Sequence, residues 1–166
     1  MSTLKVGTIQ DHANSNTAIT ISSAGVVTEP VKPTFRATTT GITLAHGTWT
    51  LMNANVTTYN RGGHYNTTTK KFIVPVAGAY FFYGRWFGSG GAGRGSSAIY
   101  VNGTLVTQNL TPMSTLNGGV QHSVEHVHNC SVSDEVQWYA YQESNGNVTH
   151  NASATLTCLL YTSDAA

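Results

Sequence analysis

The sequence predicts an all-β protein, in which a sandwich or barrel of short strands follows an extended amino-terminal arm. Short apolar and aromatic runs recur at even spacing with turn residues between them, a pattern typical of this class. Thr, Asn, Ser and Gly supply most of the polar surface, and they are unfavourable in helices because they compete with the backbone or cost entropy. No apolar pattern with the helical period is sustained anywhere.

Length and charge limit what the chain can do. Its 166 residues suffice for one domain with a hydrophobic core plus an arm, and are too few for two ordinary domains. Charged residues make up 9% and the net charge is +1, so we expect no surface for nucleic acid. No apolar run is long enough for a secretory signal or a transmembrane span, so we expect no membrane insertion.

Residues 1–29 are predicted to be an attachment arm because their apolar residues are sparse. In extended strands Leu4 and Val6 would share one face, as would Ile19 and Ile21. This apolar surface is too small for a separate core, so the arm must pack on sister chains or on another protein. Two prolines within residues 30–33 favour a stiff linker. We therefore divide the chain into an arm and linker, residues 1–32, and a head, residues 33–166.

The head is predicted to open with a strand at residues 35–37, a second strand at 49–56 and a loop at 57–64. Two strands then meet at a corner. The first ends at Pro75, which lacks an amide donor and cannot continue a central ladder. Gly78 supplies the backbone freedom for the turn. Residues 79–86 follow as an aromatic-rich strand, which suits a half-buried pleated surface.

Turn residues divide the second half of the head. Asn102-Gly103 predicts the clearest hairpin, because Asn-Gly readily adopts both left-handed positions of a type I′ turn. Glycine-rich residues 88–95 are predicted to be a surface loop, since a phosphate-binding loop would need a following helix and a strand follows here. The other predicted elements are a loop at 111–119, strands at 120–132 and 136–142, a turn at 144–147 and a last strand at 152–161.

The corner carries a family resemblance. Its residues Tyr65, Thr69, Phe72, Pro75, Gly78, Tyr80 and Phe82 resemble the most recognisable motif of the complement globular-head domains, which belong with the tumour-necrosis-factor-like trimeric jelly rolls. Lys70 stands where that pattern has glycine, so the turn before Phe72 is expected to differ in geometry. The resemblance covers residues 33–161 and implies a jelly-roll β-sandwich head that forms a homotrimer. The motif residues carried over are Tyr65, Phe72, Pro75, Gly78, Tyr80, Phe82, Asn102 and Gly103.

The opening of the chain is similar to the amino termini of bacteriophage fibre and appendage proteins, through residues 4–10 and 19–27. This implies a virion structural protein, assembled in the host cytoplasm, that binds other virion proteins through residues 1–32. Its head would face outward towards a host-surface glycan or protein. A capsid decoration protein is the alternative within this class. A stand-alone lectin-like module and a glycan-degrading enzyme are alternatives from other classes.

Four residues on one predicted strand could ligate a transition metal. His122, His126, His128 and Cys130 alternate and so share one face, where a trimer could form rings of histidines. Val124 and Val132 would share this face, which favours simple burial without a metal. We therefore predict no metal and no other cofactor.

The sequence predicts no catalytic centre. The one adjacent acidic pair, Asp134-Glu135, falls where the family has a turn, and no nucleophile elbow or zinc-protease helix is present. Cys130 and Cys158 fall on apparent strands, which favours buried free thiols over a disulfide.

Aromatic residues are predicted to lie mostly in the core or at a subunit interface: Tyr80, Phe82, Trp86, Tyr100, Trp138 and Tyr141. Those in or beside loops could instead stack on sugar rings, although loop anchoring is the favoured interpretation. They are Tyr59, Tyr65 and Phe87.

Overall fold

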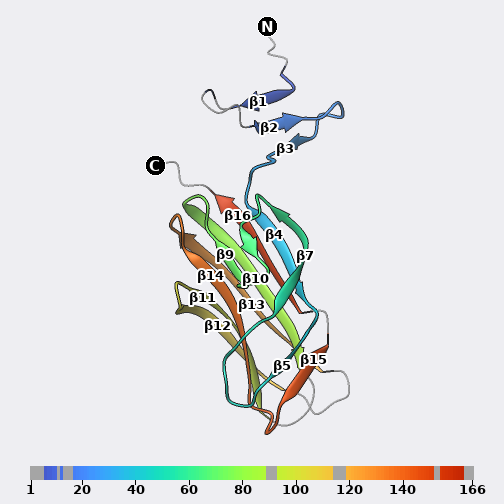
Figure 1. Cartoon of the computed structure of the whole chain (residues 1–166), viewed down its shortest axis with the longest axis vertical. Coiled ribbons are helices and arrows are strands. Elements are labelled where there is room, and N and C mark those ends of the chain that lie inside the picture. The colour runs from blue at the N-terminus through green and yellow to red at the C-terminus, as the bar shows by residue number, and fades with distance from the viewer. Residues whose placement is uncertain are drawn as a thin grey trace. The chain divides into compact units, whose positions relative to one another are not determined.

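The computed structural model describes residues 6–10, 12, 17–88, 93–113, 119–151 and 154–162 (Figure 1). Within these ranges all regular structure is β, as the sequence predicts. None of these residues belongs to a helix long and apolar enough to cross a membrane. The chain divides into two compact units, Met1–Lys32 and Pro33–Ala166.

The first unit is a small antiparallel sheet in the order β1-β2-β3. Its strands are Thr8–Gln10 (β1), Thr17–Ile21 (β2) and Val27–Thr28 (β3). Every described residue of β1 and β3 is exposed, so this sheet has almost no core of its own, as its sparse apolar residues predict. β1 begins at Thr8, so Val6 precedes this strand, and Leu4, with which Val6 is expected to share a strand face, lies outside the described residues.

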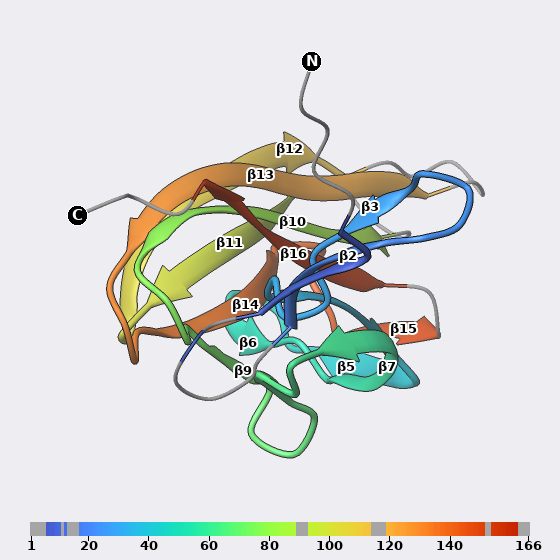
Figure 2. The same cartoon turned by 90° about the horizontal axis from the view of Figure 1, so that it is seen from above.

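The second unit is a sandwich of two sheets (Figure 2). The first sheet, called the five-stranded sheet, has the order β13-β10-β16-β4-β7. Its strands are Val120–Cys130 (β13), Gly78–Gly88 (β10), Thr155–Thr162 (β16), Thr34–Thr39 (β4) and Ala54–Arg61 (β7). All neighbouring strands pair antiparallel.

The opposite sheet, called the six-stranded sheet, has the order β12-β11-β14-β9-β8, with β6 also paired to β14. Its strands are Thr104–Pro112 (β12), Arg94–Val101 (β11), Glu135–Gln142 (β14), Lys71–Ile73 (β9), Tyr65–Asn66 (β8) and Thr50–Leu51 (β6). A ribbon of Gly41–Leu44 (β5) and Val148–Asn151 (β15) lies beside them. Two antiparallel sheets whose strands interleave along the chain make a jelly roll, as expected.

Aromatic side chains fill the space between the sheets. Phe35 of β4 stacks on Tyr65 at 4.4 Å between ring centroids and lies 5.2 Å from Phe72. Phe72 in turn lies 5.6 Å from Tyr80 and 6.3 Å from Phe82. The aromatic residues of the corner motif therefore build the core.

The segment at residues 49–64 differs from the prediction in two ways. Residues 49–56 do not form one strand, because the chain leaves the six-stranded sheet at Met52 and enters the five-stranded sheet at Ala54. The Met52 amide donates to the carbonyl of Trp138 at 2.9 Å, and its side chain is buried. The predicted loop at 57–64 is strand as far as Arg61, where β7 pairs with β4.

The predicted turns and loops of the second half of the head agree with the structure in part. Asn102 and Gly103 have φ values of 51° and 76°, which confirms the predicted left-handed turn between β11 and β12. The loop predicted at 88–95 is bounded by β10 and β11, with residues 89–92 outside the described part. The loop predicted at 111–119 begins later, because β12 continues to Pro112, and residues 114–118 are not described. The ribbon of β5 and β15 was not predicted, and β16 begins at Thr155 instead of residue 152.

Candidate interaction surfaces

The candidate metal ligands share one face of β13, but this face points into the sandwich. His122 is fully buried, its ring centroid lies 4.4 Å from that of Trp86, and its Nδ1 hydrogen bonds with the Thr111 hydroxyl. Burial lowers the pKa of His122 to about 4. The rings of His126 and His128 lie 5.6 Å apart.

Rings of three histidines would need this face to line a trimer axis, whereas here His122 is fully buried within the sandwich and His126 and His128 are half-buried on its inner side. Val132 does not share the buried face, since β13 ends at Cys130 and Val132 is 58% exposed. Among the described residues, no group of three or more His, Cys, Asp or Glu side chains is placed to hold a metal ion.

The two cysteines are free thiols and both are buried, as predicted. They lie on the two strands that flank β10, with Cys130 opposite Gly78 and Cys158 opposite Phe82. Burial raises the pKa of the Cys130 thiol to about 11, so this thiol is unreactive near neutral pH.

The adjacent acids serve a turn and an ion pair. Asp134 accepts hydrogen bonds from the Ser131 amide at 2.7 Å and the Asn102 side chain at 2.8 Å. Glu135 forms an ion pair with Lys71. Both carboxylates therefore have a structural role, and the position of Asp134 in a turn agrees with the prediction.

The three aromatic residues suggested as a ligand surface have different environments. Tyr65 is 3% exposed and its hydroxyl donates to the Ala54 carbonyl at 2.8 Å, so it cannot stack on a sugar. Tyr59 is exposed beside an open hollow lined with Thr34, Asn60 and Arg61. Phe87 is exposed on β10 itself, not in a loop, under the guanidinium of Arg85. Tyr59 and Phe87 stand three strands apart and do not form one site.

The outward face of the five-stranded sheet carries a group of neighbouring apolar side chains. Phe81 pairs with Val127 on one side and Leu159 on the other, so these residues form a row across three strands. Val127 is 51% exposed and Leu159 38% exposed. Tyr83 lies two residues further along β10, on the same face as Phe81. We call Phe81, Tyr83, Val127 and Leu159 the apolar row; a soluble monomer would leave it in contact with water.

A second group of aromatic rings covers the outward face of the six-stranded sheet. Trp49 lies 5.2 Å from Tyr141 and 6.2 Å from Tyr100, and Tyr100 lies 4.6 Å from Tyr139, measured between ring centroids. All four side chains are partly exposed. We call these four residues the aromatic floor.

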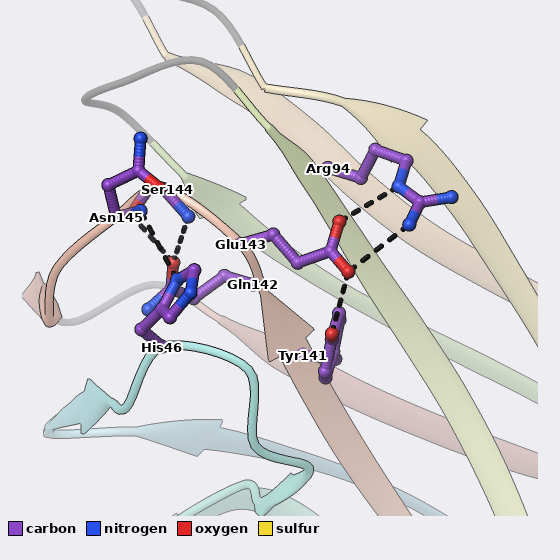
Figure 3. A network of polar contacts seen from close by, with 7 residues as sticks. All are labelled: His46, Arg94, Tyr141, Gln142, Glu143, Ser144 and Asn145. Carbon is purple, nitrogen blue, oxygen red and sulfur yellow. Dashed lines mark hydrogen bonds and ion pairs between the residues drawn. The ribbon is translucent and has the colours of Figure 1, made fainter.

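A network of polar contacts borders the aromatic floor (Figure 3). Arg94 donates two hydrogen bonds to the Glu143 carboxylate, at 2.9 and 3.1 Å, and the Tyr141 hydroxyl donates a third at 2.7 Å. The bonds from Arg94 and then Tyr141 lower the pKa of Glu143, so its carboxylate is ionised at neutral pH.

The loop that follows β14 is fixed by the buried side chain of Gln142. Its amide nitrogen donates to the carbonyls of Leu44 at 3.0 Å and Gly146 at 2.8 Å. Its oxygen accepts from the backbone amide of Ser144 at 2.7 Å. The Asn145 amide donates to the ring of His46 at 3.2 Å, which joins the loop before β6 to the same network.

Sequence reasoning missed this second surface. The sequence predicts Tyr100 and Tyr141 in the core or at a subunit interface, and no motif in it singles out Arg94 or Glu143. The ion pair between Arg94 and Glu143 forms because β11 and β14 are neighbouring strands in which Gly95 lies opposite Gln142. No local sequence motif indicates that register.

The strand order and the two-sheet architecture define the head as an antiparallel jelly roll. No family model and no curated protein matches the chain. Similar solved structures include the globular domain of zebrafish complement 1qA protein, with 14% identity, a TM-score of 0.55, and 80% of this chain and 100% of that chain covered. Murine APRIL at pH 5.0 is also similar, with 10% identity, a TM-score of 0.58, and 78% and 98% covered. These likenesses establish the fold.

Proposed function

We propose that the chain is a non-enzymatic structural and binding protein of a virion, whose arm attaches to the particle and whose head forms an outward-facing homotrimer. The apolar row carries this proposal. It presents Val127, on the edge strand β13, and Leu159, on β16, to solvent on either side of Phe81, where burial against a neighbouring subunit would remove them from water. Trimeric assembly is what the jelly-roll resemblance implies.

The arm supports the attachment role. Its described strands are short, β1 and β3 are exposed and no residue of β2 is fully buried, so an ordered arm would gain a core only by packing on another surface. Three arms on one trimer would also attach with higher avidity than one. The virion setting rests on the similarity of residues 4–10 and 19–27 to phage appendage proteins.

The solution mass of the full-length protein tests the assembly. We expect native protein to sediment as a trimer, and Leu159→Lys and Val127→Lys to sediment as folded monomers, because a charge in the apolar row opposes its burial. Val132→Lys is the matched control: Val132 is more exposed than Val127 or Leu159 but lies in the turn after β13, and its substitution should leave the trimer intact.

A monomeric native protein would overturn the trimer, and a trimer that survives both row substitutions would place the interface elsewhere. Detection of the protein in purified virus particles tests separately whether it is part of a virion. Its absence from particles in which other structural proteins are found would leave a stand-alone binding module as the better description.

A further inference from the structure

We propose that the aromatic floor and the Arg94–Glu143 pair beside it form a binding site for a neutral pyranose sugar. This sugar site would give the proposed binding protein a ligand. It rests on the proposed function, because an outward-facing head is the part of such a protein that would meet surface glycans. The site uses the six-stranded sheet, so it is distinct from the apolar row on the opposite sheet.

The rings suit the apolar face of a sugar. A pyranose presents C–H groups on its faces and hydroxyls around its edge, so aromatic rings bind a face while polar groups bind the edge. The ring plane of Trp49 is tilted by 37° from that of Tyr141, and Trp49 packs edge-on against Tyr100. The rings therefore lie side by side on the sheet and form one continuous aromatic surface. Ser96 and Ala98, which lie between β12 and β14 on this face, are fully buried, so the floor is closed beneath.

The polar border suits the hydroxyl edge. The Glu143 carboxylate has acceptor capacity beyond its bonds to Arg94 and Tyr141, and a guanidinium has five N–H donors, of which this ion pair uses two. Charged groups make the strongest hydrogen bonds to neutral partners. Vicinal hydroxyls of a sugar can therefore accept from Arg94 and donate to Glu143 together.

The charge of the border indicates which ligands it favours. Arg94 and Glu143 neutralise each other, so a phosphate would meet the Glu143 carboxylate and an ammonium group would meet Arg94. A neutral ligand rich in hydroxyls meets no such repulsion. The paired opposite charges therefore favour a neutral sugar over an anionic nucleotide or a cationic polyamine.

The site is held in place before a ligand arrives. Gln142 fixes the loop at residues 144–146 through buried hydrogen bonds, and His46 joins it from the other side (Figure 3). A preformed site loses little conformational entropy on binding. Within the head, it lies at the end opposite Pro33, whose carbonyl accepts the Leu160 amide at the other end of the sandwich.

Tryptophan fluorescence gives a selective test. Trp86 and Trp138 are buried, with 0% and 1% exposure, so Trp49 is the tryptophan that solvent and ligands can reach. The full-length protein would be titrated with the methyl glycosides of glucose, galactose, mannose, N-acetylglucosamine and N-acetylgalactosamine. We expect at least one glycoside to protect Trp49 from acrylamide quenching, with a dissociation constant of about 1 mM.

Substitutions then locate the site. Glu143→Gln keeps the shape of the side chain but removes its charge, and should weaken glycoside binding by about tenfold. Glu135→Gln is the matched control, because Glu135 forms an ion pair at the other end of the same strand, and binding should be unchanged. Trp49→Leu should abolish binding measured by calorimetry, with circular dichroism showing that the fold remains.

Failure of this inference can be told apart from failure of the proposed function. If no glycoside protects Trp49 at about 50 mM, far above the expected dissociation constant, the sugar site is wrong even when the protein is a trimer. The sugar site is also wrong if binding persists in both Glu143→Gln and Trp49→Leu. Binding that is lost in these variants supports the site even when the native protein is a monomer.

Discussion

The amide of Lys70 donates a 2.8 Å hydrogen bond to the carbonyl of Asn66, and this turn holds Lys70 in a left-handed conformation with φ of 59°. A lysine side chain is strained there, because its Cβ crowds the backbone. The family pattern has glycine at this position, and the geometry explains why: the turn before Phe72 requires positive φ. Lys70 thus adopts the left-handed conformation that glycine favours.

Replacement of Lys70 by glycine should stabilise the head. Relief of the left-handed strain is expected to raise the free energy of unfolding by about 1 kcal/mol, measured by urea denaturation. Thr69→Gly is the control at the neighbouring position, where φ is not positive and glycine should destabilise instead. A loss of stability in Lys70→Gly would show that its side chain contributes more than its strain costs.

Asn102 should respond in the opposite direction although it too has positive φ. Its side chain donates to Asp134 at 2.8 Å and accepts from the Glu135 amide at 2.8 Å, so it joins the β11–β12 turn to the turn before β14. Asn102→Gly keeps the conformation and removes both bonds, with an expected loss of about 1 kcal/mol in thermal or urea unfolding.

Asn145 provides the comparison for Asn102. It has φ of 65°, and its hydrogen bond to His46 is made by the backbone amide, which glycine retains. Asn145→Gly should therefore be neutral or slightly stabilising. Equal effects at Asn102 and Asn145 would contradict a structural role for the Asn102 side chain.

Gly84 gives room to the indole of Trp138 in the core. A Cβ added at Gly84 would lie 2.6 Å from Trp138 Nε1, and this indole is held by a 2.7 Å hydrogen bond to the Ser97 hydroxyl. Gly84→Ala should cost about 2 kcal/mol or more of stability because the ring cannot move without losing that bond. Gly146→Ala, where a Cβ meets nothing within 4 Å, should change little in the same denaturation series.

Local signals explain the parts of the fold that the sequence predicts. Pro75, the glycine turn and the alternating aromatic residues of β10 act within a few residues of one another, and so does the Asn-Gly hairpin. The switch between sheets at Met52 depends instead on a hydrogen bond to Trp138, and no proline or glycine marks it. Predicting that boundary requires the partner strand to be known.

The interaction surfaces were harder to predict for the same reason. Alternation correctly places His122, His126 and His128 on one face, but only the opposite sheet determines that this face is inside. The aromatic floor combines Trp49 with residues of β11 and β14, which meet through long-range pairing. A sequence shows which residues share a strand face, and the register of distant strands decides what that face contacts.

Burial of His122 should make the protein sensitive to mild acid. The pKa of His122 is about 4 in the folded protein, against an ordinary value of 6.5 in the unfolded chain, because burial disfavours the charged ring. Unfolding therefore takes up a proton below pH 6.5, so stability falls as the pH is lowered from 6.5 towards 4 and this contribution stops changing below 4. Between pH 7 and 5 the loss should be about 2 kcal/mol.

Urea denaturation at pH 7, 6 and 5 measures this loss in the native protein and in His122→Phe. The phenyl ring can pack on Trp86 as the imidazole does, but it does not titrate, so the variant should lose about 2 kcal/mol less than the native protein over this range. His12→Gln removes an exposed histidine and serves as the matched control. The comparison depends on the change with pH, so a uniform loss of stability from the missing Thr111 hydrogen bond does not affect it. Parallel pH profiles for the native protein and His122→Phe would show that His122 is protonated without unfolding, and that its burial is not the source of acid sensitivity.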